Sequence, residues 1–230
     1  MKTIGLIGGI SWESSAQYYQ IINRAVGARL GGVHSCDCLM YSVDFAVIEA
    51  LQRENDWQTL NSIMADAGYR LQQGGAELIL ICANTMHKCA EAVEQVSGLR
   101  VLHIADVTAE AIKKRGMKTV GLLGTRYTME GTFYTGRLKD LHGIETLIPD
   151  AEDRQTVHDI IFEELVVGKL LPASKTRLLE VIGRLHASGA EGVILGCTEL
   201  PLLVDHEDCD VPLFDTTELH ALAGVDYALS

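Results

Sequence analysis

Two segments of the chain repeat each other in order, and this duplication constrains the fold more than any other feature of the sequence. Residues 119–125 repeat residues 3–9, with a strand-like apolar run and glycines at the same places. Residues 189–194 repeat residues 75–80 with nearly the same offset. Two matches in the same order predict a pair of duplicated lobes.

The repeated segments are typical of buried parallel strands. Each is a short apolar run, rich in branched side chains and bounded by glycine. We predict strands at 3–9, 38–43, 78–81, 101–105, 119–125, before Cys197 and at 211–216, with helices at about 14–30 and 57–73. This alternation predicts an α/β fold, with two similar lobes, parallel central sheets and a cleft between them. We expect one lobe to comprise residues 1–99 and 213–230, and the other residues 100–212.

Composition narrows the class of protein. The 230 residues are 47% hydrophobic and carry a formal net charge of −12, which argues against nucleic acid or an anionic membrane as a partner. Six cysteines show no metal-type pairing, so we expect no metal site and reduced thiols, as in the cytoplasm. Neither a basic leader nor an apolar run of about 18 residues is evident, so we expect no signal peptide and no membrane span.

Cys197 is the leading candidate for chemistry. It follows a predicted core strand, and ligands bind at the carboxyl ends of strands in open α/β sheets. Thr198 is predicted to cap the next helix and Pro201 to occupy its first turn, so that helix start would favour a thiolate. Such a thiolate is a base or a nucleophile. The alternative is an inert cysteine in the core.

The duplication places Ala83, and not Cys82, at the position equivalent to Cys197. Because side chains alternate along a strand, Cys82 is expected to point away from any site that Ala83 faces. The chain therefore carries one cysteine where its internal symmetry offers two places.

Further candidates lie at the other predicted strand ends. Gly8 and Gly9 allow close approach of a bound group, although their spacing is not that of a dinucleotide fingerprint. Asn84 and Thr85 would cap a helix or bind ligand. Arg53 would clamp a carboxylate or remain solvated. We read His87 as a cap or a solvated side chain in preference to a base.

Four motifs together resemble the aspartate/glutamate racemase family: Gly-Gly-Ile-Ser-Trp at 8–12, Asn-Thr-Met-His at 84–87, Leu-Leu-Gly-Thr at 122–125 and Gly-Cys-Thr-Glu at 196–199. The resemblance spans essentially the whole chain. It implies racemisation of an amino acid or similar dicarboxylate without PLP, metal or other cofactor, by a cysteine on each lobe, in a possible homodimer. It assigns catalysis to Cys197 and substrate binding to Ile10, Gln52, Ala83, Asn84, Thr85, Thr125, Thr198 and Glu199.

Three positions depart from the family pattern. Ala83 stands where the first motif has a proton-transferring residue, so we expect weak or one-sided activity. The arginine of a Pro-Asp-Arg loop has no match, which leaves Gln52 and Arg53 as substitutes. Val166 stands in place of a lysine.

Two alternatives follow from the single cysteine. One is a decarboxylase or isomerase of the same superfamily, in which Cys197 protonates one face of a carbanion. The other is a ligand-binding homologue in which Ala83 has removed catalysis.

Overall fold

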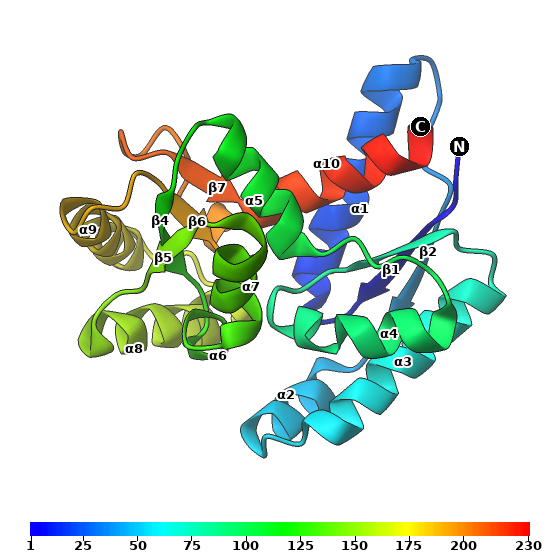
Figure 1. Ribbon diagram of the computed structural model, residues 1–230, viewed down its shortest axis with the longest axis horizontal. Helices are drawn as coiled ribbons and strands as arrows, with labels where there is room; N and C mark the ends of the chain where they lie inside the picture. The colour runs from blue at the N-terminus through cyan, green and yellow to red at the C-terminus, as the bar shows by residue number, and fades with distance from the viewer. The chain divides into compact units, whose positions relative to one another are not determined.

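The computed structural model describes residues 1–230, and the chain divides into two compact units (Figure 1). The first unit comprises Met1–Ile104 and His220–Ser230, and the second comprises Ala105–Leu219. Both units are built on a parallel β-sheet covered by helices, as the sequence predicts. We describe each unit in turn.

The first unit contains a three-stranded parallel sheet in the order β2-β1-β3. The helix α3 and the strand β3 have the bounds predicted from the sequence, and α1 begins two residues before the expected Ser14. The elements are β1 (Ile4–Gly8), α1 (Trp12–Leu30), β2 (Cys38–Ser42), α2 (Phe45–Arg53), α3 (Trp57–Gln73), β3 (Leu78–Ile81), η1 (Thr85–Cys89) and α4 (Ala90–Ser97), with most of α10 (Thr216–Leu229) added from the end of the chain.

The second unit contains a four-stranded parallel sheet in the order β5-β4-β6-β7. Its elements are α5 (Ile104–Lys114), β4 (Thr119–Leu123), α6 (Arg126–Met129), α7 (Thr132–His142), β5 (Glu145–Leu147), α8 (Ala151–Asp159), the π-helical turn η2 (Ile160–Glu164), η3 (Leu165–Val167), α9 (Pro172–Ala187), β6 (Val193–Leu195), η4 (Leu200–Leu202) and β7 (Leu213–Asp215).

The strand predicted at residues 101–105 does not form over that range. Only Val101 pairs with the first sheet, through an isolated parallel bridge to Ile79. The backbone N–H of Ile79 donates to Arg100 and its carbonyl accepts from Leu102, after which the chain enters α5 at Ile104. The helix therefore begins where the strand was expected to continue.

The strand at 213–215 belongs to the second unit, although we had expected it in the first lobe. Its residues pair with β6, and the N–H of Val193 donates to the carbonyl of Pro212 at 2.8 Å. The chain passes into the first unit only at His220, within α10. Each sheet thus has its own partner beyond its third strand, Val101 in the first unit and β7 in the second.

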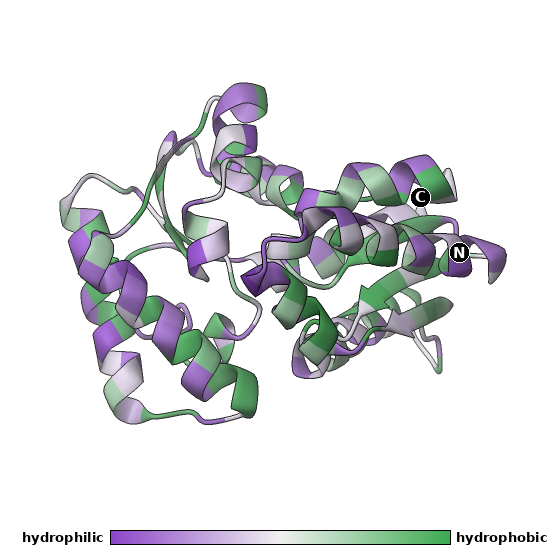
Figure 2. Cartoon of the chain, turned by 90° about the horizontal axis from the view of Figure 1, so that it is seen from below, coloured by the Kyte–Doolittle hydropathy of each residue, from purple (hydrophilic) through white to green (hydrophobic).

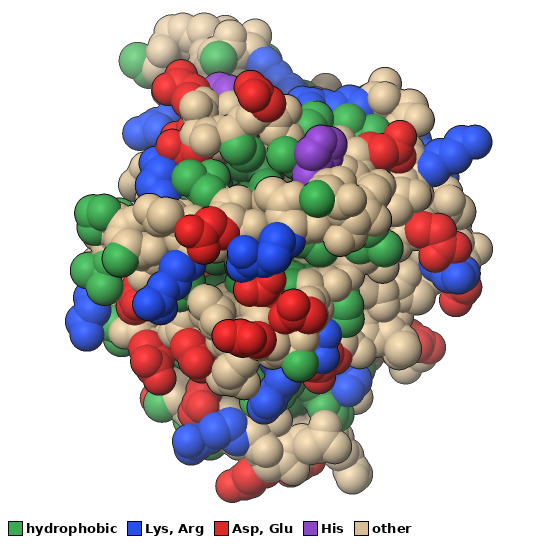
Figure 3. Space-filling view, turned by 90° about the vertical axis from the view of Figure 1, so that its left-hand side faces the viewer, with side chains coloured by type: hydrophobic (Ala, Val, Ile, Leu, Met, Phe, Trp, Pro, Cys, Tyr) green, Lys and Arg blue, Asp and Glu red, His purple; other side chains and the backbone are tan.

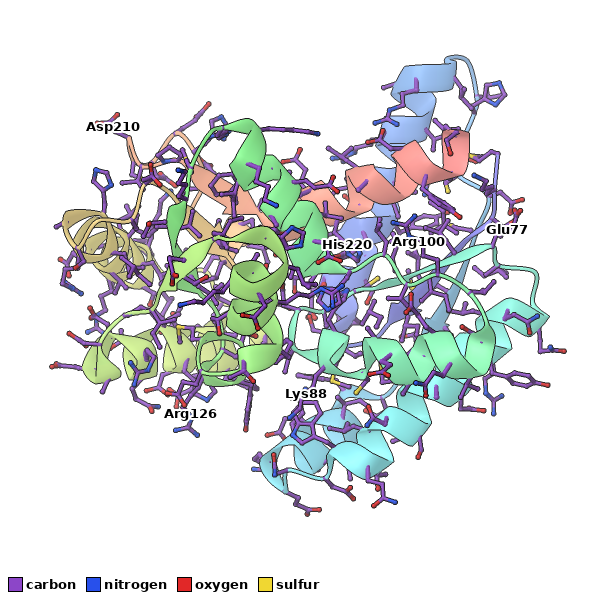
Figure 4. All side chains as sticks on the ribbon, in the orientation of Figure 1. Glu77, Lys88, Arg100, Arg126, Asp210 and His220 are labelled. Carbon is purple, nitrogen blue, oxygen red and sulfur yellow. The ribbon has the colours of Figure 1, made fainter.

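Matching hydrogen bonds support the duplication predicted from the sequence. The carboxylate of Glu77 accepts from the N–H of Thr3 at 2.8 Å, and that of Glu191 accepts from the N–H of Thr119 at 2.8 Å. In both units the glutamate N–H also donates back to the threonine carbonyl at 2.9 Å. Figure 4 labels Glu77, which lies just before β3. The same local contacts therefore fix the first and third strands of each sheet.

The two faces of the first sheet bury different side chains. Ile7, Ile79 and Ile81 belong to the core that also contains residues of α2, α3 and α4. Leu6 and Leu80 belong to the core formed with α1 and α10. Figure 2 shows that the sheet of this unit is coloured hydrophobic, whereas its helices carry both colours. Burying each such branched side chain contributes about 1.5–3 kcal/mol, which makes the sheet a rigid support for the segments that follow its strands.

The exposed surface mixes charges of both signs. On the face drawn in Figure 3, acidic and basic side chains lie among one another and alternate with hydrophobic groups. No helix of the structure has the length and apolar character needed to cross a membrane.

Candidate functional site

Cys197 lies just beyond the carboxyl end of β6, where the sequence predicts it. Gly196 separates it from the strand and donates its N–H to the carbonyl of Leu123 at the end of β4. A Cβ on Gly196 would lie 2.8 Å from that carbonyl, so only glycine fits. The close approach holds the segments that follow β4 and β6 beside each other within the second unit.

The thiol of Cys197 is buried and donates a hydrogen bond to the carboxylate of Glu199. The distance from Sγ to Oε2 is 3.0 Å, and the hydroxyl of Thr198 donates to the same oxygen at 2.8 Å. All three side chains are buried. We refer to Cys197, Thr198 and Glu199 as the Cys197 cluster. A buried carboxylate that accepts two hydrogen bonds is a proton acceptor placed directly against a thiol.

The resting form of Cys197 is the thiol, which corrects the thiolate expected from the sequence. Burial raises its pKa well above the ordinary value, and the charge of Glu199 raises it further. The N–H groups of Thr198 and Glu199 point toward the sulfur and oppose this shift, but they are the smaller influence. The helix expected to stabilise a thiolate is only the short turn η4, which begins at Leu200.

Thr198 does not cap that turn. No side chain makes a cap hydrogen bond at the start of η4, and the hydroxyl of Thr198 is directed to Glu199 instead. Pro201 does lie in the first turn, as predicted.

Thr125 lies in the segment that follows β4 and caps α6. Its side chain accepts from the N–H of Thr128 at 3.4 Å, and the two hydroxyl oxygens are also 3.4 Å apart. Both side chains are buried. The second unit thus gathers hydroxyls, a thiol and a carboxylate at the carboxyl ends of two adjacent strands, where a small polar ligand would bind in an α/β sheet.

The corresponding segments of the first unit follow β1 and β3. The N–H of Cys82 donates to the carbonyl of Ile7, so these two strand ends are also adjacent. Gly9 has a φ of +88°, and a Cβ there would collide with the backbone of Val43. Its N–H donates to the hydroxyl of Ser15 at 2.8 Å. This glycine is required by the turn, which supports the structural role considered for the glycine pair.

Ala83 and Cys82 lie on opposite faces of the sheet, as predicted. Ala83 packs in the core that faces α3 and α4, and Cys82 packs in the core that faces α1 and α10. Burial raises the pKa of Cys82, so its thiol is inert. Ala83, at the position equivalent to Cys197, therefore has only a methyl group as its side chain.

Asn84 and Thr85 begin η1 immediately after Ala83. Asn84 is buried and Thr85 is partly buried. The prediction that they cap a helix is wrong, because no side chain makes a cap hydrogen bond at this turn. Ile10 is buried and belongs to the same core cluster as Ala83.

His87 is buried, which corrects its reading as a solvated or capping side chain. Its Nδ1 donates to the carbonyl of Ala83 at 2.8 Å, because a carbonyl only accepts. Its ring lies 4.8 Å from that of His103 and 5.3 Å from that of His220. Together with Tyr18, these residues form what we call the histidine cluster.

Two hydrogen bonds fix the tautomer of His220 in the histidine cluster. Its Nε2 donates to the carbonyl of Leu102 at 2.6 Å, so its Nδ1 accepts from the hydroxyl of Tyr18 at 2.8 Å. Burial, together with repulsion from His87, lowers the pKa of His220 to about 3. Figure 4 labels His220 on α10. No sequence pattern predicts this cluster, because its members come from four separate segments of the chain.

The two residues expected to replace the family arginine are Gln52, which is neutral, and Arg53, which pairs with a neighbouring carboxylate. Arg53 pairs with Glu49 one helical turn away, at 3.1 Å, and its side chain is largely exposed. Gln52 is buried and its amide nitrogen lies 3.1 Å from the sulfur of Met86. Val166 lies in η3. No group of three or more His, Cys, Asp or Glu side chains is arranged to hold a metal ion.

The chain is similar to known proteins over nearly its whole length. Residues 7–224 match the family model described as Asp/Glu/Hydantoin racemase. The crystal structure of a Yersinia pestis protein proposed to be an Asp/Glu racemase is 52% identical, with a TM-score of 0.94 and full coverage of both chains. An aspartate racemase homologue from Pyrococcus horikoshii OT3 is 35% identical, with a TM-score of 0.87 and full coverage of both chains. The broad specificity amino-acid racemase RacX of Bacillus subtilis is 24% identical over 231 residues, which cover 99% of this chain and 98% of that protein.

Proposed function

The chain belongs to the Asp/Glu/Hydantoin racemase family, and from that premise we propose that it moves the α-proton of an acidic amino acid without a cofactor, with Cys197 as the proton-transferring group. The observation that carries the proposal is the buried contact between the thiol of Cys197 and the carboxylate of Glu199, at the carboxyl end of β6. A thiol paired with a carboxylate supplies both a proton donor and a base that accepts its proton.

The proposed step uses both members of this pair. The Glu199 carboxylate takes the S–H proton of Cys197, and the resulting thiolate removes the α-proton of the substrate, whose electron pair is left on the α-carbon and delocalised into the α-carboxylate. In the reverse direction the thiol returns its proton to the same carbon. The N–H groups that point toward the sulfur favour the thiolate during this step.

Stabilising the charge that develops on the carboxylate is the second requirement. An α-proton is weakly acidic, so donors must be aimed at the carboxylate oxygens of the reacting carbon. We assign this role to the hydroxyls of Thr85 and Thr125 and to the amide of Asn84. These groups are neutral donors.

Ala83 makes the proposed activity asymmetric. Its methyl group neither donates nor accepts a proton, so the position of the first unit that is equivalent to Cys197 lacks the second proton-transferring partner that inversion requires. Losing one acid or base partner costs about 10²–10⁴-fold in rate. We therefore propose slow racemisation accompanied by faster proton exchange on one enantiomer.

Chiral chromatography of aspartate and glutamate tests the proposal. We expect Cys197→Ala to abolish racemisation, and Ala83→Cys to raise it by about 10²-fold or more, because it restores a proton-transferring group. Ala83→Thr is a second restoring variant. Cys209→Ser is the matched control, since Cys209 lies in a partly exposed loop of the same unit, and it should change nothing. Unchanged racemisation in Cys197→Ala would remove Cys197 from the mechanism.

The single thiol also favours a second candidate. A one-sided proton donor is sufficient for a decarboxylase that protonates a carbanion after carbon dioxide has left. Release of carbon dioxide from a malonate-type acid, lost in Cys197→Ala, would support this activity over racemisation. Absence of turnover on both classes of substrate, combined with saturable binding, would favour a ligand-binding protein.

A further inference from the structure

A second pair of chemically competent side chains lies on the edge of the first sheet, at the start of β2. The strand β2 pairs only with β1, which leaves its other edge without a strand partner. Cys36 and Cys38 lie on either side of Asp37, and both are partly exposed. Both thiols pack against the core that faces α1 and α10, so they lie on the same side of the chain.

The backbone around the two cysteines is held firmly. The N–H of Cys36 donates to the side-chain oxygen of Asn23 at 3.0 Å, and the carbonyl of Asp37 accepts from the N–H of Ile4 at 3.0 Å. Cys38 is the register partner of Ile4 in the sheet. Two hydrogen bonds therefore tie the backbone at the two cysteines to α1 and β1.

The two thiols interact with each other. The S–H of Cys36 donates to the carbonyl of Asp37 at 3.3 Å. The neighbouring Cys36 lowers the pKa of Cys38 to about 7, whereas the pKa of Cys36 itself is raised. By contrast, burial raises the pKa of the thiols in the interior of both units (Cys82, Cys89 and Cys197). Of these two partly exposed thiols, Cys38 is therefore the one expected to act as the nucleophile.

We propose that Cys36 and Cys38 form a two-thiol site that reduces hydroperoxides and closes to an intrachain disulfide. The Cys38 thiolate attacks the terminal oxygen of the hydroperoxide, breaks the O–O bond and releases an alcohol, or water from hydrogen peroxide, after protonation. The product at Cys38 is a sulfenic acid. The Cys36 thiol then attacks that sulfur and water leaves, so two thiols are oxidised as one peroxide is reduced.

Ring closure requires a local rearrangement of the backbone, because the Cβ atoms of a disulfide lie only about 3.5–4.5 Å apart. Residues two apart in an extended strand have Cα atoms about 6.6 Å apart. Disulfides form at Cα separations of about 4.4–6.8 Å. Closure is therefore possible near the upper limit, and it draws Asp37 out of its extended conformation. The hydrogen bond from the N–H of Ile4 to Asp37 is the contact that this movement weakens.

Peptide mapping of the peroxide-treated full-length protein tests the proposal. The reduced chain is treated with hydrogen peroxide, its remaining thiols are alkylated, and it is digested with trypsin. The peptide Leu30–Arg53 contains Cys36 and Cys38 and no other cysteine. We expect this peptide to lose two hydrogen atoms and to resist alkylation unless a reductant is added first. Two alkylated cysteines in that peptide, or a disulfide that links two chains, would overturn the proposal.

Two single variants separate the roles of the cysteines. In Cys36→Ser the sulfenic acid at Cys38 should persist and be trapped by dimedone, because the second thiol is missing. In Cys38→Ser the reaction with peroxide should slow about 10-fold, since an ordinary thiol is only a few per cent ionised at pH 7. Cys209→Ser is the matched control and should behave as the unmodified chain. Equal peroxide reactivity in Cys36→Ser and Cys38→Ser, without trapped sulfenic acid, would contradict the assigned roles.

Discussion

The buried imidazole of His220 makes the stability of the first unit depend on pH. In the folded chain its pKa is lowered to about 3 by burial and by His87, whereas an unfolded chain has an ordinary histidine pKa of about 6.5. As the pH falls below about 6.5, the unfolded chain takes up a proton that the folded chain refuses. The contribution of neutral His220 to stability is therefore fully present above that pH, and it is lost progressively as the pH falls toward 3.

The size of this effect follows from proton linkage. One proton of difference changes the free energy of unfolding by about 1.4 kcal/mol per pH unit. We expect His220 to remove about 1.4 kcal/mol between pH 7.5 and 5.5, and about 3 kcal/mol by pH 4.5. The variant His220→Gln keeps an amide donor but does not titrate, so its pH dependence should lack this component. At pH 7.5 it should already be less stable by about 1–3 kcal/mol, because Tyr18 or Leu102 loses a buried hydrogen bond.

Urea unfolding followed by tryptophan fluorescence measures the effect in the relevant unit. The chain has two tryptophans, Trp12 and Trp57, and both belong to the first unit. The difference in unfolding free energy between His220→Gln and the unmodified chain should shrink as the pH falls. Parallel curves for the two proteins between pH 7.5 and 4.5 would refute the assignment of a neutral, buried His220.

Three further predictions test the fold and the Cys197 cluster. Gly9→Ala should destabilise the first unit by about 1–3 kcal/mol or more in urea unfolding, because φ is +88° and the added Cβ meets the backbone of Val43; an unchanged midpoint would contradict the tight turn. Glu199→Gln should lower the pKa of Cys197 by removing a neighbouring charge, so alkylation of this thiol should begin at lower pH; an unmoved pH profile would show that the charge does not act on the sulfur. Glu191→Ala should lower the thermal unfolding midpoint of the second unit, since two backbone N–H groups lose their acceptor, and an unchanged midpoint would show that water replaces it.

Local patterns predicted much of the architecture. The helix α3 and the strand β3 have the predicted bounds, because helical periodicity and a continuous apolar run are short-range signals. The opposite directions of Cys82 and Ala83 followed from strand alternation alone. The predicted strand at 101–105 failed because its apolar residues fit the first turn of α5 as well as they fit a strand.

Features set by distant contacts were not predictable from local patterns. The histidine cluster joins His87, His103 and His220, which no sequence spacing relates, and their burial depends on how α1 and α10 pack on the sheet. The protonation of Cys197 was also missed, because the helix start expected after it would favour a thiolate, whereas burial and Glu199 raise its pKa. Electrostatic properties require the three-dimensional environment, even where the chemical group itself is evident from the sequence.

Proton NMR in deuterated water tests most directly whether Cys197 moves the α-proton of an acidic amino acid. L- and D-aspartate and L- and D-glutamate are incubated separately with the unmodified chain and with Cys197→Ala, and inversion is followed in the same samples by chiral analysis. We predict loss of the α-proton signal from one enantiomer, faster than inversion, and no loss with Cys197→Ala. Exchange that persists in Cys197→Ala, or no exchange with any of the four amino acids, would contradict the account.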